Sequence, residues 1–161
     1  MRSFLLGRNP RRTAIRAAIL VGVSVAVFGW ILIPIRAQGI SMQPTYEPGS
    51  FHFVNRLAFV RRAPARGEVV GIRLAGAGVM YVKRIVGLPG ERVRIEGGRV
   101  LVNDAALDEP YVRHRRVNWS LPETELGADE YFVVGDNRGM PIGLHELGKV
   151  RRERIVGRVV F

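Results

Sequence analysis

The longest apolar run of the chain lies near its N-terminus. Residues 17–35 read AAILVGVSVAVFGWILIPI, which is 19 residues without a charged side chain. A helix of that length covers roughly 28 Å, about the thickness of the hydrocarbon core of a bilayer. Trp30 and Pro34 lie near its far end, where an interfacial ring and a helix break are tolerated. Because the run is apolar on every face, it predicts a transmembrane anchor rather than a buried helix of a water-soluble protein.

The charges around this run predict its orientation. Five arginines precede it, Arg36 follows it, and the first 36 residues contain no acidic side chain. The positive-inside rule places residues 1–16 in the cytoplasm as a basic segment and residues 37–161 outside. A cleaved signal peptide is the alternative, but its apolar region is normally about 7–15 residues long, and Ile35, Arg36 and Ala37 match a cleavage site poorly. We therefore expect an uncleaved, single-pass anchor in the plasma membrane.

Beyond the anchor, short β-type runs alternate with turn signals and no helical period persists. Gly97 and Gly98 separate two such runs, which is typical of a two-residue hairpin. Residues 113–130 are the least regular stretch, and we expect a solvated loop there or a flap over a groove. The predicted fold class is mostly β, an antiparallel β-sheet ectodomain over residues 37–161 behind a single N-terminal membrane helix. The β-type runs are residues 51–56, 68–74, 79–87, 92–96, 99–103, 130–135 and 154–161.

Composition narrows the chemistry that this ectodomain can carry. The chain has no cysteine and its three histidines have no short spacing, so we expect no disulfide, no metal centre and no cofactor. The formal net charge is +11, but no DNA- or RNA-reading motif accompanies it, so we expect no nucleic-acid partner. Hydrolytic chemistry would then need a Ser or Thr nucleophile, or paired carboxylates.

Ser41 and Lys83 are the candidate nucleophile and base. Ser41 lies just outside the anchor, and no His-Asp pair is evident to activate it, whereas a neutral lysine can do so. Lys83 interrupts an apolar strand, although 23 of the 25 Lys and Arg residues of the chain are Arg, which cannot lose its proton. At its ordinary pKa only about one lysine amine in 2,500 is neutral at pH 7, so we expect Lys83 to be buried among Val79, Tyr81 and Ile85. A lysine that reaches solvent from a strand edge is the alternative.

The chain resembles the bacterial type I signal peptidases, which are membrane-bound serine peptidases of the Ser-Lys class. The resemblance covers essentially the whole chain and rests on several separated segments in the family's order. These are residues 39–45 (Gly-Ile-Ser-Met-Gln-Pro-Thr), 66–70 (Arg-Gly-Glu-Val-Val), 81–91, 107–112 (Leu-Asp-Glu-Pro-Tyr-Val) and 135–138 (Gly-Asp-Asn-Arg).

The resemblance implies catalytic roles for two side chains and one backbone group. Ser41 is the acylating nucleophile and Lys83 is the general base, which later acts as the acid. The backbone N–H of Ser41 contributes to an oxyanion hole. Gly39 stands where many members of the family carry a serine that donates a second hydrogen bond to the oxyanion.

The resemblance also implies supporting roles for three residues. Asp136 is expected to pair with Arg84 and so to hold the strand that carries the lysine. Met42 is expected to face the bilayer or the core beside the bound substrate. Taken alone, Met42 is equally consistent with ordinary packing, and residues 135–138 with a plain β-turn.

Residues 139–147 depart from the family pattern. They read Gly-Met-Pro-Ile-Gly-Leu-His-Glu-Leu. Aligned without a gap, the hydroxyl that usually orients the lysine becomes Pro141, and an Asp and an Arg that often pair become Gly143 and His145. His145 is either a replacement base or, as we expect, a residue with a surface or supporting role.

Two functions remain open at this point. Water or the hydroxyl of Tyr81 or Ser50 could replace the missing group, and the retention of Ser41 and Lys83 favours an active endopeptidase that removes signal peptides from exported preproteins. The alternative is a catalytically impaired relative that binds peptides or partner proteins. Signal peptides, membrane lipid and the protein-export machinery are the expected partners. Soluble self-cleaving repressors share the Ser-Lys chemistry, but they lack such an anchor.

Overall fold

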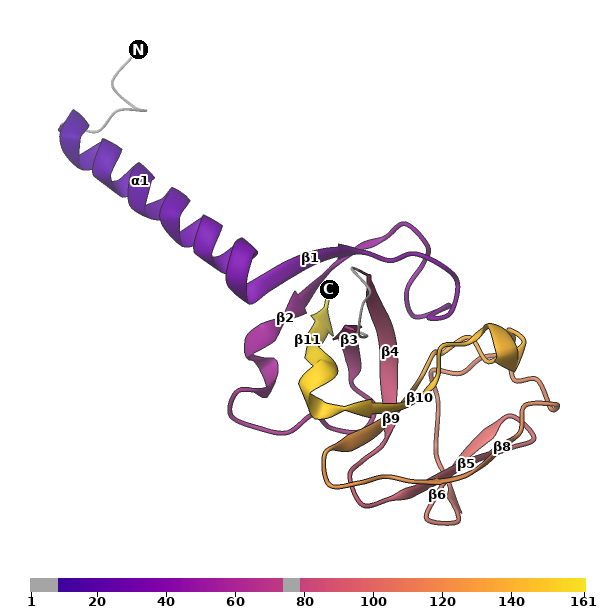
Figure 1. Cartoon of the computed structure of the whole chain (residues 1–161). Coiled ribbons are helices and arrows are strands. Elements are labelled where there is room, and N and C mark those ends of the chain that lie inside the picture. Colours follow the sequence, from indigo (N-terminus) through magenta and orange to yellow (C-terminus); the bar gives the residue numbers. More distant parts are fainter. Residues whose placement is uncertain (1–8, 74–78) are drawn as a thin grey trace.

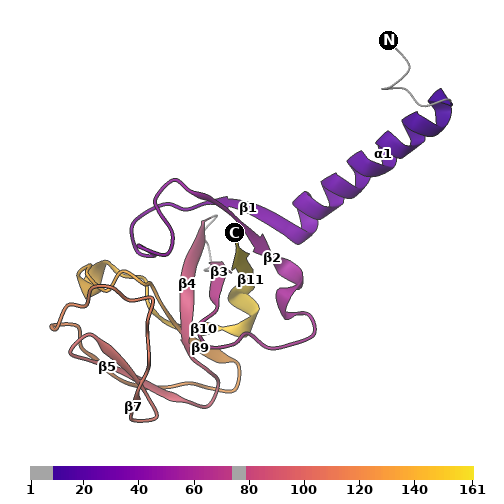
Figure 2. The same ribbon diagram turned by 180° about the vertical axis from the view of Figure 1, so that it is seen from behind.

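The chain folds as one long helix followed by two antiparallel sheets (Figures 1 and 2). The structure is a computed structural model that describes residues 9–73 and 79–161. Two parts of the predicted elements lie outside the described residues. They are residues 1–8 of the basic segment and Leu74 at the end of one β-type run.

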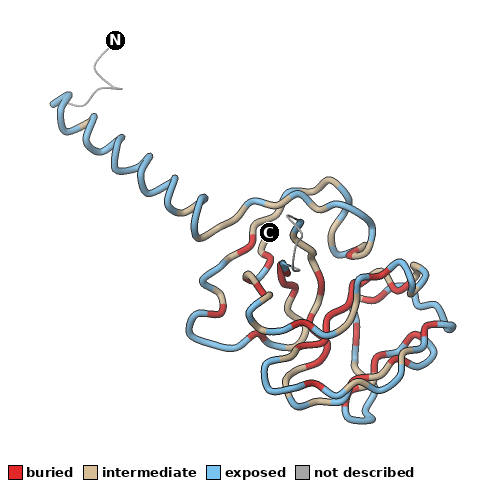
Figure 3. The backbone as a smooth tube through the Cα atoms, viewed as in Figure 1, coloured by how far each residue is buried: buried red, intermediate tan, exposed pale blue. Residues whose placement is uncertain are grey.

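The helix is α1 (Pro10–Ala26), which continues as a π-helical turn over Val27–Ile31. Proline is well suited to the first turn of a helix, because its missing N–H would have no intrahelical partner there. Pro10–Ile31 is long and apolar enough to cross a membrane, by length and composition. It projects away from the sheets and none of its residues is buried (Figure 3). Its apolar surface is therefore largely uncovered by the described chain, although near its end the Phe28 ring lies 5.8 Å from the ring of Phe53.

The helix stops short of the predicted boundary at Ile35. Leu32–Arg36 instead forms strand β1, which pairs antiparallel with β2 (Phe51–Asn55). Pro34 cannot continue a helix and cannot donate to a strand ladder, but it is tolerated on an edge strand. Because β1 is the outermost strand of its sheet, Pro34 meets that condition.

Seven strands form the larger sheet, in the order β1-β2-β11-β3-β4-β9-β10, and every pairing is antiparallel. Four strands form the smaller sheet, in the order β7-β6-β5-β8. The remaining strands of the larger sheet are β3 (Val69–Arg73), β4 (Met80–Gly87), β9 (Glu130–Val134), β10 (Gly148–Arg151) and β11 (Ile155–Val160). Those of the smaller sheet are β5 (Arg92–Glu96), β6 (Arg99–Val102), β7 (Ala105–Ala106) and β8 (Leu121–Glu125). Short 3-10 turns cover Arg56–Phe59, Ile142–Leu144 and Arg152–Arg154.

The mostly β, antiparallel fold class is confirmed, and each predicted β-type run forms a strand where it is described. The predicted hairpin at Gly97 and Gly98 is also confirmed. It joins β5 to β6 with Glu96 opposite Arg99, and the two glycines have φ angles of 53° and 77°. Positive φ at both central positions is what a tight two-residue hairpin turn requires.

The prediction of a solvated loop over residues 113–130 is wrong for its second half. Leu121–Glu125 forms β8, and Leu126 is buried. Trp119 is fully buried, and its indole N–H donates a 2.7 Å hydrogen bond to the carbonyl oxygen of Met140. A buried tryptophan with a satisfied N–H anchors a segment in the core, so this stretch is part of the packed domain.

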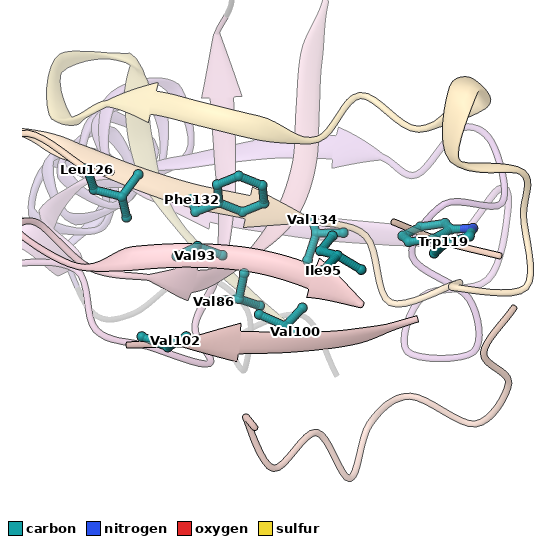
Figure 4. Close-up of a cluster of buried hydrophobic side chains, with 9 residues drawn as sticks. All are labelled: Val86, Val93, Ile95, Val100, Val102, Trp119, Leu126, Phe132 and Val134. Carbon is teal, nitrogen blue, oxygen red and sulfur yellow. The ribbon is translucent and has the colours of Figure 1, made fainter. Parts of the chain in front are cut away.

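The largest core cluster joins the two sheets (Figure 4). Val86 and Phe132 come from the larger sheet, whereas Val93 and Val100 come from the smaller one. A second cluster packs on the larger sheet around Val70, Ile72, Ile85 and Val133, and a third contains Met42, Val54, Val69 and Val159. The third cluster lies under the loop between β1 and β2, which carries the predicted nucleophile.

Candidate active site

The loop between β1 and β2 carries Ser41 and is held by the turn that follows β9. The backbone N–H of Asn137 donates to the carbonyl oxygen of Ser41 at 3.0 Å, and the Asn137 side-chain amide donates to the carbonyl oxygen of Ile40 at 3.0 Å. Gly135 passes so close that a Cβ atom built there would collide with the Ser41 carbonyl. The absence of a side chain at residue 135 is therefore what lets the two segments meet.

Lys83 lies in β4 and is almost completely buried, with 2% of its surface exposed. Its Nζ atom lies 3.1 Å from Ser41 Oγ, which is hydrogen-bonding distance. Ile85 is fully buried on the same strand, but Val79, which the sequence predicted among the shielding residues, is 60% exposed. Lys83 is therefore buried as expected, although Val79 itself is exposed.

Burial lowers the pKa of the Lys83 ammonium, because water no longer solvates the charged form. Glu146 Oε2 lies 3.5 Å from Nζ, and this carboxylate raises the pKa of Lys83 without cancelling the effect of burial. Within residues 9–73 and 79–161, Nζ hydrogen-bonds only Ser41 and Glu146. A neutral Lys83 amine at this position would be able to accept a proton from the Ser41 hydroxyl.

Glu146 is the site residue that the sequence analysis missed. It is the one acidic side chain in the altered segment 139–147, and that was the signal available in the sequence. The two hydroxyls suggested as substitutes do not hydrogen-bond Nζ within the described chain. Ser50 Oγ instead donates to the carbonyl oxygen of Glu47 at 2.6 Å and lies 2.7 Å from His52 Nε2.

Arg84 and Asp136, which were expected to pair, form a two-pronged ion pair. Arg84 Nε lies 2.8 Å from Asp136 Oδ1, and Nη2 lies 2.5 Å from Oδ2. Thr45 Oγ1 donates to Asp136 Oδ2 at 2.5 Å, and the Arg84 guanidinium stacks over the Tyr111 ring at 3.9 Å from its centroid. Successive residues of a strand point to opposite faces, so this network lies on the face of β4 opposite Lys83. It joins the lysine strand to the loop that carries Ser41.

A second buried ion pair supports the same turn. Arg138 and Glu109 have fully buried side chains; Arg138 Nη1 lies 3.4 Å from Glu109 Oε2, and Nη2 contacts Oε1 more closely. Arg138 Nε also donates to the carbonyl oxygen of Gly135 at 2.9 Å. Both residues belong to segments that carried the family resemblance, but nothing in their spacing predicted that they pair.

His145 lies against this turn. Its Nε2 is 2.8 Å from the carbonyl oxygen of Asn137, so this nitrogen carries the proton, and its ring meets Trp119 edge-on at 4.7 Å. Burial lowers the pKa of His145, which favours the neutral ring. Within the described chain it has no hydrogen bond to Ser41. These contacts agree with a supporting role rather than with a replacement base.

A cleft of about 610 Å³ opens beside Ser41 and Lys83. Gly39, Ser41, Lys83 and Glu146 are among the residues that line it. Gly39 has a φ of 77° and nothing within 4 Å of a Cβ position, so it shapes the loop without contributing a side-chain donor. Met42 is 5% exposed and packs with Val54, Val69 and Val159. Its side chain therefore belongs to the core next to the cleft and does not face a bilayer.

The strands beside the cleft have free edges. β1 pairs only with β2, and β4 pairs with β9 only from Arg84 onwards, among the strands that the structure describes. Residues 35–42 and 79–83 line the cleft. Unpaired backbone N–H and C=O groups on such edges can accept an extended peptide as an additional strand. In the described parts of the chain, no cluster of His, Asp or Glu is arranged to hold a metal ion.

Comparison with known proteins decides the family. The family model "Signal peptidase, peptidase S26" matches residues 11–161. The chain belongs to this family. "Signal peptidase I" of Leptolyngbya laminosa is 34% identical over 133 residues, which cover 74% of this chain and 63% of that protein. "Probable signal peptidase I-2" of Synechocystis sp. is 33% identical over 91% of this chain and 68% of that protein.

The solved structure of a signal peptidase I from Enterococcus faecalis V583 is also similar, with 23% sequence identity and a TM-score of 0.49. The match covers 62% of this chain and 98% of that structure.

Proposed function

We propose that this protein is a membrane-anchored serine endopeptidase that removes signal peptides from exported preproteins with Ser41 and Lys83. The observation that carries the proposal is the 3.1 Å contact between the Ser41 hydroxyl and a buried lysine amine. Membership of the signal peptidase family supplies the class of substrate. The chain spans 63% and 68% of the length of the two relatives named above, so the activity of the whole protein is part of the proposal.

The geometry supports acyl transfer in two steps. Neutral Lys83 takes the proton of Ser41 as Oγ attacks the scissile carbonyl, and the backbone N–H of Ser41 stabilises the developing oxyanion. The lysine ammonium then gives its proton to the leaving amine, and an acyl-enzyme forms. A water molecule, deprotonated by Lys83, releases the acyl group and restores Ser41.

The substrate would bind as an extended strand between the two free edges that line the cleft. Backbone hydrogen bonds to β1 and β4 would give affinity, and side-chain pockets along the cleft would give selectivity. The membrane helix would hold the cleft close to the bilayer, where the apolar segment of a signal peptide delivers the bond to be cut. Confinement to one plane raises the effective concentration of that bond.

The anchor orientation and the other partners are part of the same proposal. Arg11, Arg12 and Arg16 lie in the first turns of α1, and the positive-inside rule places that end in the cytoplasm. The ectodomain would then act outside the plasma membrane, in contact with membrane lipid and close to the protein-export machinery.

Cleavage of model preproteins in liposomes tests the proposal. The wild-type chain should cut at the end of the signal peptide, and both Ser41→Ala and Lys83→Arg should abolish cleavage, because Arg keeps the charge but cannot accept a proton. The rate should rise with pH as Lys83 loses its proton. Activity that survives Lys83→Arg would require another base. A wild-type chain that binds but does not cut several preproteins would favour the peptide-binding alternative.

A further inference from the structure

The altered segment 139–147 brings one carboxylate to the catalytic lysine. His145 is buried against Trp119 and the carbonyl oxygen of Asn137, and Leu147 packs against the main core cluster. His145 has an extended backbone, in which alternate residues point to opposite sides. Glu146 accordingly faces the cleft, which it lines, while its two neighbours face the core.

We propose that Glu146 is a positioning residue for Lys83. Its carboxylate accepts a hydrogen bond from Nζ and holds the amine against Ser41 Oγ, in the role that an orienting hydroxyl would otherwise fill and that Pro141 cannot supply. This inference deepens the proposed function. Its predictions for preprotein cleavage rates rest on that function, whereas its prediction for the pKa of Lys83 does not.

The bonding capacity of a neutral lysine amine fits this arrangement. The amine has one lone pair and two N–H bonds. When an N–H points to Glu146, at 3.5 Å, the lone pair is free to accept the Ser41 proton, at 3.1 Å. Without an acceptor at residue 146 the amine could rotate about its stem, and an unoriented amine is a poorer base.

The difference in exposure between the two groups lets the carboxylate orient the lysine without keeping it permanently charged. The Lys83 side chain is 2% exposed, whereas that of Glu146 is 56% exposed. A solvated carboxylate remains ionised at little cost, and water screens its attraction for the ammonium. Burial therefore still dominates the electrostatics of the lysine.

The other titratable groups around the cleft make different contacts. Arg36, Tyr46, His52 and Tyr81 line the same cleft, and none of them hydrogen-bonds Nζ within residues 9–73 and 79–161. Two further groups nearby are engaged elsewhere, because His145 bonds to Asn137 and Arg138 to Glu109. Glu146 is therefore the group whose removal should change the titration of Lys83.

The chain offers a direct readout, because Lys83 and Lys149 are its only lysines. Carbon-13-labelled lysine in the full chain, in detergent micelles, gives two side-chain signals, and Lys149→Arg assigns them. Glu146→Gln should lower the pKa of Lys83, because a neighbouring negative charge is removed. Glu153→Gln, which removes an exposed carboxylate elsewhere, should leave it unchanged. An unchanged pKa of Lys83 in Glu146→Gln overturns the proposal, and this result does not depend on peptidase activity.

Preprotein cleavage separates orientation from charge. Measured at pH values above the titration of Lys83, Glu146→Gln should stay within about threefold of wild type, because the amide oxygen still accepts a hydrogen bond. Glu146→Ala should lose between about 10- and 100-fold in kcat. A Glu146→Ala variant that keeps the wild-type kcat in a correctly folded chain overturns the proposal, whereas wild-type inactivity would instead count against the proposed peptidase function.

Discussion

Asp136 accepts hydrogen bonds from Arg84 on strand β4 and from Thr45 on the loop that carries Ser41. One fully buried carboxylate thus ties the strand of the predicted base to the loop of the predicted nucleophile. Ser41 and Lys83 lie 42 residues apart in the sequence, and we expect their hydrogen bond to depend on this connection.

Replacing Asp136 by Asn should disrupt both stability and catalysis. The substitution leaves the largely buried Arg84 without its counter-charge, which typically costs about 3–5 kcal/mol. Thermal unfolding and preprotein cleavage would measure the two effects. Asp104→Asn is the matched control, because the Asp104 side chain is 57% exposed and pairs with Arg92 and Arg94 at the surface. Exposed ion pairs contribute about 1 kcal/mol or less. Equal effects at the two positions would contradict the role given to Asp136.

Replacing Gly135 by Ala should displace the nucleophile. The new methyl group would collide with the Ser41 carbonyl, and a displacement of about 1 Å at a catalytic group can cost about 100-fold in rate. Gly143→Ala is the control, because nothing lies within 4 Å of a Cβ at that position. Single-turnover cleavage would compare the two variants. A fully active Gly135→Ala variant would mean that the loop tolerates a shift away from the turn.

The Glu109–Arg138 pair should show strong coupling in stability. Arg138→Met or Glu109→Gln alone leaves one buried charge without a partner and should cost about 3–5 kcal/mol. The double variant Glu109→Gln/Arg138→Met removes both charges and should recover most of that loss. For a chain of this size, about 1 kcal/mol corresponds to about 2–4 °C in Tm, so calorimetry would resolve the difference. Additive losses would show that the two side chains act independently.

Lys83 should reduce the free energy of unfolding at neutral pH, because the burial that lowers its pKa also disfavours the folded state. Burial lowers the pKa of Lys83 in the folded chain from its ordinary value of 10.5, so the unfolded chain binds more protons over the interval between the two values. Stability must then rise with pH through that interval, because folding releases a proton from Lys83 and this release becomes more favourable as the pH rises.

Lys83→Met should therefore be more stable than wild type at neutral pH, and the difference should shrink as the pH approaches 10.5. Denaturant unfolding across this pH range would test it, with Lys149→Arg as a control at a lysine whose side chain is 44% exposed. A stability difference that does not vary with pH would indicate that packing, rather than protonation, separates the two chains.

Local patterns in the sequence predicted much of the sheet. Short β-type runs between turn signals marked strands such as β4 and β5, and the Gly97–Gly98 pair marked the hairpin. β1 was missed because its residues continue the apolar run of the membrane helix, so composition alone shows no boundary. β8 was missed because its side chains are mostly exposed and include Pro122 and two glutamates, which are uncommon in strands. Such a sequence is tolerated because β8 lies at one edge of the smaller sheet.

The candidate site was predictable where residue type restricts chemistry. The chain uses Arg for nearly all of its cationic side chains, so a lysine within an apolar strand indicated a base at Lys83. The position of Lys83 beside Ser41 agrees with that argument. Glu146 was not predictable in the same way, because its contact with Nζ depends on how His145 and Leu147 pack beneath it. Sequence spacing carries no information about such a contact, since Lys83 and Glu146 are 63 residues apart.

The direct passage from Ile31 in the helix to Leu32 in β1 also has a consequence for substrate choice. No loop separates the helix from β1, whose residues Ile35 and Arg36 line the cleft. We expect the helix, once embedded in lipid, to set the height of the Ser41 hydroxyl above the bilayer. If the chain cleaves preproteins as proposed, the distance from the apolar segment of a preprotein to its scissile bond should then limit which bond is broken.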